Sequence, residues 1–456
     1  MGATPGDRHA QRTRTRHTAP RPGCRSLESA AGHARQWCSG SERCGGTAGS
    51  ATTAVGRTTA HATTTRPAAG RSASDHTDDH HHCNDHHDHA ADLAARELLG
   101  RRLFHDTNLS QPVGISCASC HNPLRAFAGN HGGTFGVPLG STGTAGLRNT
   151  PTAMYAGFTP AFSVAMTPRG VQARGGQFLD GRADTLTQQA LGPLLATAEM
   201  NNPTAAAVVA KVAASSYAAA FKTAWGADIF TRPADAFIAI GRSLEAYERS
   251  AEFRPFTSRY DDLLRGRDTF TAAEKRGMHA FFAADKGDCI SCHAADRGNR
   301  DPAASLFTNY TYVALGVPRN AAIPANTDPT FFDLGLAGPK RSAPVGVTGA
   351  AGEFKVPTLR NVALKSAFMH NGRFASLTEV VGFYATRDID PRRWYPVGNI
   401  FNDLPTTLRS NVTHRSPLDL HPGDRPRLTP GDVSDIVAFL GTLTDVPPAS
   451  TFGTAQ

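Results

Sequence analysis

Two copies of one pentapeptide carry the clearest chemistry in this sequence: Cys117–His121 and Cys289–His293. Each reads Cys-x-x-Cys-His, in which the two thiols can form thioether bonds to one porphyrin and the histidine can bind its iron. A thioredoxin-like dithiol is one alternative. A zinc knuckle is another, but zinc needs four ligands brought together, and the two motifs lie far apart in the chain. We therefore expect two covalently bound haem c groups, with these attachment and ligand residues: Cys117, Cys120, His121, Cys289, Cys292 and His293.

The overall composition is that of a globular protein. The chain has 456 residues, of which 40% are hydrophobic, and its length allows two or three domains. The net charge of +8 is spread along the chain without a Lys/Arg block, so we expect no nucleic-acid partner. No apolar run approaches the roughly 18 residues of a membrane-spanning helix, so we expect no membrane span.

The N-terminal part, residues 1–91, differs from the rest. It is dense in Arg, Thr, Ala, Gly, Ser and His and poor in large aliphatic residues, so it cannot bury enough apolar surface to order itself. The histidines from His76 to His89 could bind metal ions loosely, although a solvated polar tract is the favoured interpretation. We expect a disordered or non-native low-complexity tail. It also contains the remaining cysteines, which follow no recognisable spacing: Cys24, Cys38, Cys44 and Cys83.

The predicted location follows from haem attachment rather than from a targeting signal. Haem c is attached on the far side of the inner bacterial membrane, which predicts a periplasmic protein. Residues 1–30 show no apolar core of a secretory signal, which conflicts with this expectation. We expect that the conflict reflects a start that is not native coding sequence.

The elements that must position the two motifs are predicted to be helices. Ala95, Leu99 and Leu103 recur at i, i+4 and i+8 and predict a helix that leads to the first motif. A second helix, between the motifs, is indicated by an apolar stripe: Phe237, Ile240, Leu244 and Tyr247.

Three N-terminal capping patterns predict further helices. They lie at Thr271–Glu274, Ser376–Glu379 and Thr429–Asp432. The first of these helices precedes the second haem motif. The last presents one apolar face: Val433, Ile436, Val437, Leu440 and Leu443.

These patterns predict a mainly α fold with two cytochrome c-like haem domains and long ordered loops. We expect an N-terminal domain over residues 92–245 and a C-terminal domain over 246–445, with a short tail over 446–456. The Gly-, Pro- and Asn-rich stretches 122–176 and 294–360 would form the loops around the haems. Beyond the haem motifs, the two halves are not detectable as sequence repeats.

The sequence around the two haem motifs resembles bacterial di-haem cytochrome c peroxidases, and it is closer to the MauG-like branch of that superfamily. The resemblance spans about residues 93–445, and its motifs keep their order and spacing. They are Leu103-Phe104, Leu109-Ser110, Arg148–Thr152, Gln177–Arg182, Gln189–Pro193, Glu199-Met200, Phe354–Asn361 and Met369–Gly372.

Tyr384 stands where the peroxidases carry a methionine ligand to the second haem, and MauG-like proteins have a tyrosine there. The spacing of Leu377, Val381 and Tyr384 at i, i+4 and i+7 independently places the ring on the buried face of its helix. An ordinary core tyrosine is the alternative. The resemblance implies that Tyr384 binds the second iron, where a phenolate would lower the iron's potential.

The first haem is expected to keep an open coordination position. The position at which the peroxidases carry a displaceable histidine is Val137 here, and the nearby His131 lacks the surrounding motif. The resemblance therefore implies a five-coordinate iron that is held by His121 alone and is open to peroxide.

The resemblance also implies a distal pocket over the first haem, formed by Gln189, Pro193 and Glu199. Glu199 is the expected acid/base, because a carboxylate above the iron can move a proton between the two peroxide oxygens. A solvated glutamate at a helix end is the alternative. One departure concerns charge transfer between the haems, since Leu179 replaces the family's inter-haem tryptophan, with Phe178 beside it.

A calcium ion between the haems is a further implication of the resemblance. Asn149 matches its side-chain ligand, and Lys365 and Ala367 match the positions that supply backbone carbonyls. The family usually has Thr and Pro at those two positions, and carbonyl ligation tolerates the change.

The sequence thus predicts a periplasmic di-haem oxidoreductase that reduces hydrogen peroxide with electrons from a small redox protein, a cytochrome c or a cupredoxin. Two alternatives stay open: a MauG-like oxidase acting on a protein or organic substrate, and a non-catalytic di-haem electron carrier. A homodimer is also left open.

Overall fold

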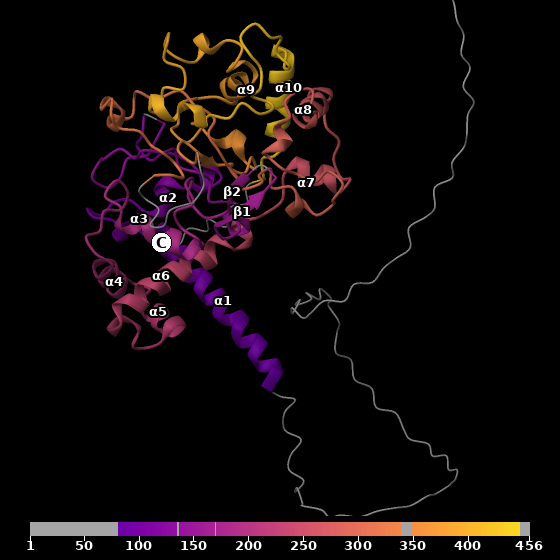
Figure 1. Cartoon of the computed structure of the whole chain (residues 1–456). Coiled ribbons are helices and arrows are strands. Elements are labelled where there is room, and N and C mark those ends of the chain that lie inside the picture. Colours follow the sequence, from indigo (N-terminus) through magenta and orange to yellow (C-terminus); the bar gives the residue numbers. More distant parts are fainter. Residues whose placement is uncertain (1–80, 135, 169, 339–348, 447–456) are drawn as a thin grey trace, which may run out of the picture. The chain divides into compact units, whose positions relative to one another are not determined.

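The computed structural model describes residues 81–134, 136–168, 170–338 and 349–446. These residues are rich in helix and contain little sheet, which confirms the mainly α prediction (Figure 1). None of the described helices is both long and apolar enough to cross a membrane. The helices are α1 (His81–His105), α2 (Cys117–Cys120), α3 (Leu186–Leu195), α4 (Ala205–Ala213), α5 (Ala218–Trp225), α6 (Pro233–Glu248), α7 (Arg259–Leu264), α8 (Ala272–Phe282), α9 (Leu377–Thr386) and α10 (Pro430–Gly441).

The β structure within the described residues is limited to two short antiparallel ladders. In the first, β1 (Ser163–Thr167) pairs with β2 (Gly170–Arg174) as a hairpin. In the second, β3 (Tyr312–Val313) pairs with β4 (Phe354–Lys355). The second ladder joins two loops that are far apart in the sequence.

Residues 1–80, and with them most of the predicted N-terminal tail, lie outside the described residues, whereas α1 begins at His81. The end of the tail at residue 91 stays a prediction. Of the predicted C-terminal tail, only Val446 is described.

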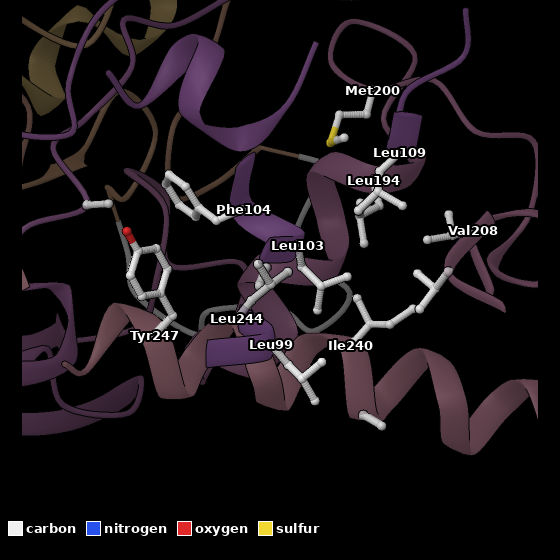
Figure 2. Close-up of a cluster of buried hydrophobic side chains, with 14 of the residues drawn as sticks. Leu99, Leu103, Phe104, Leu109, Leu194, Met200, Val208, Ile240, Leu244 and Tyr247 are labelled. Atoms are coloured by element: carbon white, nitrogen blue, oxygen red, sulfur yellow. The ribbon is translucent and has the colours of Figure 1, made fainter. Parts of the chain in front are cut away.

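The first hydrophobic core lies where α1 crosses α6. Leu99, Leu103 and Phe104 of α1 face Leu244 and other apolar residues of α6, and all of them are almost fully buried (Figure 2). Gly100 permits the close approach of the helices, since a Cβ there would lie 1.9 Å from the carbonyl oxygen of Ser243. This crossing places the end of α1 directly before the first haem motif.

The second core repeats this arrangement with α8 and α10. Phe281 of α8 and Phe439 of α10 are buried together. A Cβ on Gly277 would lie 1.8 Å from the carbonyl oxygen of Asp435, so glycine is again required at the crossing. The predicted caps at Thr271 and Thr429 are confirmed, because each side chain accepts a hydrogen bond from the backbone of its helix.

The two halves share more than these helix crossings. An isolated β-bridge joins Gln177 to Ala183, and a second joins Phe368 to Phe374. Shortly after each bridge a helix begins, α3 with Thr185 as its N-cap and α9 with Ser376 in a capping box. The two halves therefore share backbone features, although their sequences show no detectable repeat beyond the haem motifs.

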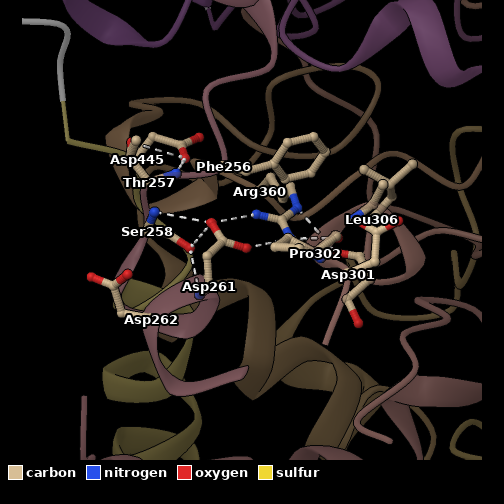
Figure 3. A network of polar contacts seen from close by, with 12 residues as sticks. Phe256, Thr257, Ser258, Asp261, Asp262, Asp301, Pro302, Leu306, Arg360 and Asp445 are labelled. Atoms are coloured by element: carbon tan, nitrogen blue, oxygen red, sulfur yellow. Dashed lines mark hydrogen bonds and ion pairs between the residues drawn. The ribbon is translucent and has the colours of Figure 1, made fainter. Parts of the chain in front are cut away.

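A buried ion pair anchors loops of the second half (Figure 3). The guanidinium of Arg360 donates to both carboxylate oxygens of Asp261, at 2.9 and 3.0 Å, and both side chains are fully buried. Arg360 also donates to the carbonyl oxygens of Pro302 and Ser305.

The domain boundary between residues 245 and 246 stays a prediction.

Candidate haem sites

The first haem motif is held in a fixed shape by local hydrogen bonds. Its cysteines form α2, and the side chains of Ser116 and Ser119 cap this turn reciprocally. His121 follows, and its Nδ1 lies 3.0 Å from the carbonyl oxygen of Phe127. A carbonyl can only accept, so Nδ1 carries the proton and Nε2 is the nitrogen with a lone pair for iron. Burial lowers the pKa of His121, which keeps the imidazole neutral.

The second haem motif has the same construction. Nδ1 of His293 lies 3.0 Å from the carbonyl oxygen of Phe307. Burial lowers the pKa of His293 to about 4. Phe127 and Phe307 both have left-handed backbone conformations, with φ of 51° and 54°. The two histidines are thus prepared in the same way as neutral iron ligands.

None of the four motif cysteines forms a disulfide, so their sulfur atoms are available for thioether bonds. Burial raises the pKa of Cys117 to about 12 and that of Cys120 to about 11, and it raises the pKa of Cys289 to about 12. Within the described residues, no group of three or more His, Cys, Asp or Glu side chains could hold a metal ion.

A cavity of about 1020 Å³ adjoins the second motif. This is at the upper end of ordinary ligand sites, so a porphyrin fits. Cys289, Cys292 and His293 line it, and so does one face of α9 that includes Tyr384. The predicted orientation of this face is confirmed. The lining residues of α9 are Leu377, Val380, Val381, Tyr384 and Ala385.

Tyr384 is suited to bind a metal but not to ionise without one. Burial raises the pKa of its phenol above the ordinary value, the nearby thiols of Cys292 and Cys289 raise it further, and Arg387 opposes them. A bound iron would supply the positive charge that a buried phenolate needs. Ligation by Tyr384 stays a prediction.

The predicted distal residues lie on and after α3. Gln189 and Pro193 are both half-buried and lie one helical turn apart on the same side of α3. Burial is the main cause of the raised pKa values of Cys117 and Cys120, and the Glu199 carboxylate contributes to both. Glu199 is therefore near the first motif. The large cavity at the second motif includes none of these three residues.

The structural repeat relates Pro193 to Tyr384. Each residue stands the same number of positions after the N-cap of its helix, Thr185 for α3 and Ser376 for α9. Proline has no side-chain atom that can bind iron, whereas tyrosine has one. The related positions therefore offer a ligand at the second site and none at the first.

Val137 and His131, the two positions considered for a further ligand at the first motif, lie in different surroundings. Val137, at the position of the displaceable histidine, is fully buried in the protein core. His131 is exposed. Leu179, at the position of the inter-haem tryptophan, lines the large cavity together with Phe178, whose ring lies 3.4 Å from the guanidinium carbon of Arg182.

The predicted calcium ligands are close together, but their hydrogen bonds do not fit a metal ion. Nδ2 of Asn149 lies 2.8 Å from the carbonyl oxygen of Ala367 and donates to it. The Oδ1 atom that would bind calcium instead accepts from Asn130, at 3.2 Å. The third predicted ligand residue, Lys365, brings an ammonium group to the carbonyl oxygen of Thr150.

One acidic residue near the first motif was missed by the sequence analysis. Glu248, at the end of α6, is buried, and its carboxylate helps to raise the pKa of Cys117. Burial raises the pKa of Glu248 itself to about 8. The available signal was its spacing, because Glu248 follows Leu244 at i+4 on the apolar stripe of α6.

Two histidines with the same backbone hydrogen bond, each directly after a Cys-x-x-Cys pair, define a c-type cytochrome with two haem-binding motifs. Comparisons with known proteins agree. The family model described as "Di-haem cytochrome c peroxidase" matches residues 94–269. The methylamine utilization protein MauG of Paracoccus denitrificans is 37% identical over 362 residues, which cover 76% of this chain and 88% of that protein.

Two further relatives extend the comparison to peroxidases. The cytochrome c551 peroxidase of Pseudomonas aeruginosa is 26% identical over 365 residues, 77% of this chain and 79% of that protein. The crystal structure of the dihaem peroxidase BthA from Burkholderia thailandensis matches with a TM-score of 0.73 and 42% identity, covering 77% of this chain and 86% of that chain. The chain belongs to the di-haem cytochrome c peroxidase and MauG family, and it is an oxidoreductase.

Proposed function

We propose that this protein is a periplasmic enzyme that reduces hydrogen peroxide at the haem held by His121. The electrons would come from a small redox protein, a cytochrome c or a cupredoxin, through the haem held by His293. One observation carries the proposal: the repeat offers Pro193 at the first site and Tyr384 at the equivalent position of the second. One iron would stay open to a substrate and the other would be closed.

Each haem would supply an iron that can give or take one electron at a time. The residues of the chain would hold the haems, orient the substrate and move protons. His121 and His293 would hold the irons through Nε2, while their Nδ1–H bonds to backbone carbonyls fix the ring orientation. The overall reaction consumes one hydrogen peroxide, two electrons and two protons and gives two waters. Glu199 would accept a proton from one peroxide oxygen and return it to the other, and Gln189 would orient the substrate.

A second candidate is a MauG-like oxidase that acts on a protein or an organic molecule. One observation favours it. Tyr384 rather than methionine faces the second site. Sequence identity does not separate the two functions, since it is 37% to a MauG and 42% to the dihaem peroxidase BthA. A phenolate ligand favours oxidised iron, which suits storage of oxidising equivalents better than electron entry.

The experiment that tests the proposal is peroxide turnover with a reduced donor cytochrome. The parent should turn over, and Glu199→Gln should slow turnover by about 10²–10⁴-fold, because it keeps the size and hydrogen bonding of the side chain but removes the proton acceptor. His131→Ala is the matched control and should leave the rate unchanged.

Other outcomes separate the rival functions. Oxidation by peroxide without turnover of any reduced cytochrome would favour the MauG-like oxidase. Two six-coordinate low-spin ferric irons with no reaction toward peroxide would indicate an electron carrier and would contradict both enzymatic functions.

A further inference from the structure

Two backbone contacts related by the internal repeat join the halves of the protein. The N–H of Asn149 donates to the carbonyl oxygen of His370, at 2.8 Å, and the N–H of Lys355 donates to that of Leu179, also at 2.8 Å. Asn149 and Lys355 each stand two residues before a proline, and His370 and Leu179 each belong to a loop closed by one of the repeated β-bridges. We call this pair of contacts the junction.

The side chains of Asn149 and Lys355 are directed at equivalent carbonyl groups. Asn149 donates from Nδ2 to the carbonyl oxygen of Ala367, the residue before the Phe368 bridge. Lys355 donates from Nζ to the carbonyl oxygen of Gly176, the residue before the Gln177 bridge. The junction therefore has an amide on one side and the Lys355 ammonium on the other, and burial lowers the pKa of that ammonium to about 8.

A second ammonium group lies on the Asn149 side. Nζ of Lys365 lies 2.7 Å from the carbonyl oxygen of Thr150, the residue after Asn149. Lys365 and Ala367 belong to the same segment of the chain. The Asn149 side chain donates to this segment, and the Lys365 side chain donates from it to the segment that contains Asn149. Each side of the junction thus has one lysine that donates to a carbonyl group of the other half.

The orientation of the Asn149 amide is determined by backbone groups. The N–H of Thr150 must donate, at 3.0 Å, so the Asn130 atom that it contacts is Oδ1. Nδ2 of Asn130 then faces the carbonyl oxygen of Gly136, at 3.0 Å, and Oδ1 of Asn149, at 3.2 Å. Nδ2 of Asn149 is left to donate to Ala367.

A calcium ion at Asn149 would need the opposite orientation. Calcium binds oxygen, so Oδ1 would have to turn toward the carbonyl of Ala367, which would place two amide nitrogens against each other at Asn130. The ion would also lie next to the ammonium of Lys365, and two buried positive groups repel. Both effects oppose calcium at this position.

We infer that Lys355 and Lys365 act as built-in cations at the two related carbonyl contacts, so that this protein closes its junction without calcium. Each lysine is attached to the chain and cannot be removed by a chelator. The Asn149 amide and the Ala367 carbonyl, which would otherwise be calcium ligands, are already hydrogen-bonded. The residue that makes the difference is Lys365, which stands where the family usually has threonine.

The first test uses the haem-loaded parent protein dialysed against EGTA. Elemental analysis should find far less than one calcium per chain, and the thermal midpoint should be the same in EGTA and in excess calcium chloride. One firmly bound calcium per chain, with a midpoint that falls in EGTA, would overturn the inference whatever the variants do.

The second test compares three variants by calcium content and thermal midpoint. Lys355→Met and Lys365→Met should each lower the midpoint by a few degrees, because a buried carbonyl loses its donor. Calcium should not rescue Lys355→Met. The double variant Lys365→Thr/Ala367→Pro, which restores the residues usual in the family, should bind about one calcium and be stabilised by it. Unchanged midpoints in both methionine variants, or no calcium in the double variant, would contradict the inference.

Discussion

Pro193 and Tyr384 show how one residue can make two related pockets chemically different. Both follow the N-cap of their helix by the same number of residues. The histidines on the other side of the haems are prepared alike, with the same 3.0 Å bond to a phenylalanine carbonyl. Since the two histidines do not distinguish the sites, we expect the difference to come from other residues, and Pro193 and Tyr384 are the candidates.

The first prediction concerns Tyr384. Tyr384→Phe keeps the ring against Leu377 and Val381 but removes the only oxygen, so the fold should survive while the second haem changes from low-spin to high-spin in the ferric state. Its potential should rise as the electron-rich ligand is lost. Electron paramagnetic resonance and a redox titration would measure both changes. A variant with the parent spectrum at both haems would make Tyr384 an ordinary core residue.

The second prediction concerns the buried carboxyl of Glu248. Burial raises its pKa to about 8, Glu245 adds to the shift and Arg249 opposes it. The folded chain keeps this proton up to about pH 8, whereas the unfolded chain loses it near the ordinary value. The Glu248 carboxyl therefore makes its whole contribution to the free energy of unfolding below its ordinary pKa. This contribution is lost as the pH rises to about 8.

Glu248→Gln should remove this dependence. Between about pH 5 and pH 8, the parent should lose stability relative to the variant by on the order of a few kcal/mol, measured by chemical denaturation at each pH. Parallel curves for the two proteins would show that Glu248 is ionised in the folded state or exchanges its proton with a partner.

At this scale, the sequence predicted what depends on covalent chemistry. The Cys-x-x-Cys-His residues and the cavity-facing side of Tyr384 follow from spacing alone. Glu248 and the hydrogen bonds of Asn149 could not be predicted, because they depend on neighbours such as Asn130 and Ala367 that only the fold brings together.

At the scale of elements, short sequence patterns were sufficient to predict where helices begin. The capping side chains of Thr271, Ser376 and Thr429 all bond as predicted, because a cap needs only residues three positions apart. The crossings of α1 with α6 and of α8 with α10 were not predicted. Gly100 and Gly277 are the residues that permit these crossings, and a glycine inside a helix does not reveal its partner.

The third prediction tests the crossing of α8 and α10. Gly277→Ala would place a Cβ 1.8 Å from a backbone oxygen, so the helices must separate, and we expect a loss of about 1–3 kcal/mol of stability. Gly441→Ala is the control, because its Cβ would meet no atom within 4 Å. The better helix propensity of alanine should stabilise that variant by up to about 1 kcal/mol. A stabilised Gly277→Ala protein would show that the helices are less closely packed than described.

At the scale of the whole molecule, the repeat explains both the predicted and the missed features. Composition and motif spacing were enough for a mainly α protein with two haem motifs. The sequence shows no repeat beyond the haem motifs, because the shared features are at positions such as the Gln177 and Phe368 bridges, where the backbone is alike and the side chains are not. Pro193 and Tyr384 are related only through this backbone.

The last prediction assigns the two irons to the two halves. Acid–acetone extraction of the denatured parent should leave two haems on the chain, because thioether bonds survive it. Cys117→Ala/Cys120→Ala should retain only the second haem and give a low-spin ferric spectrum, since both His293 and Tyr384 face that site. Cys289→Ala/Cys292→Ala should retain only the first and give a high-spin spectrum, since Pro193 offers no ligand opposite His121. Mass spectrometry would count the haems and electron paramagnetic resonance would report the spin states. The same spin state in both single-haem proteins would mean that the difference between the sites does not come from Pro193 and Tyr384, and the proposed division of labour would fail with it.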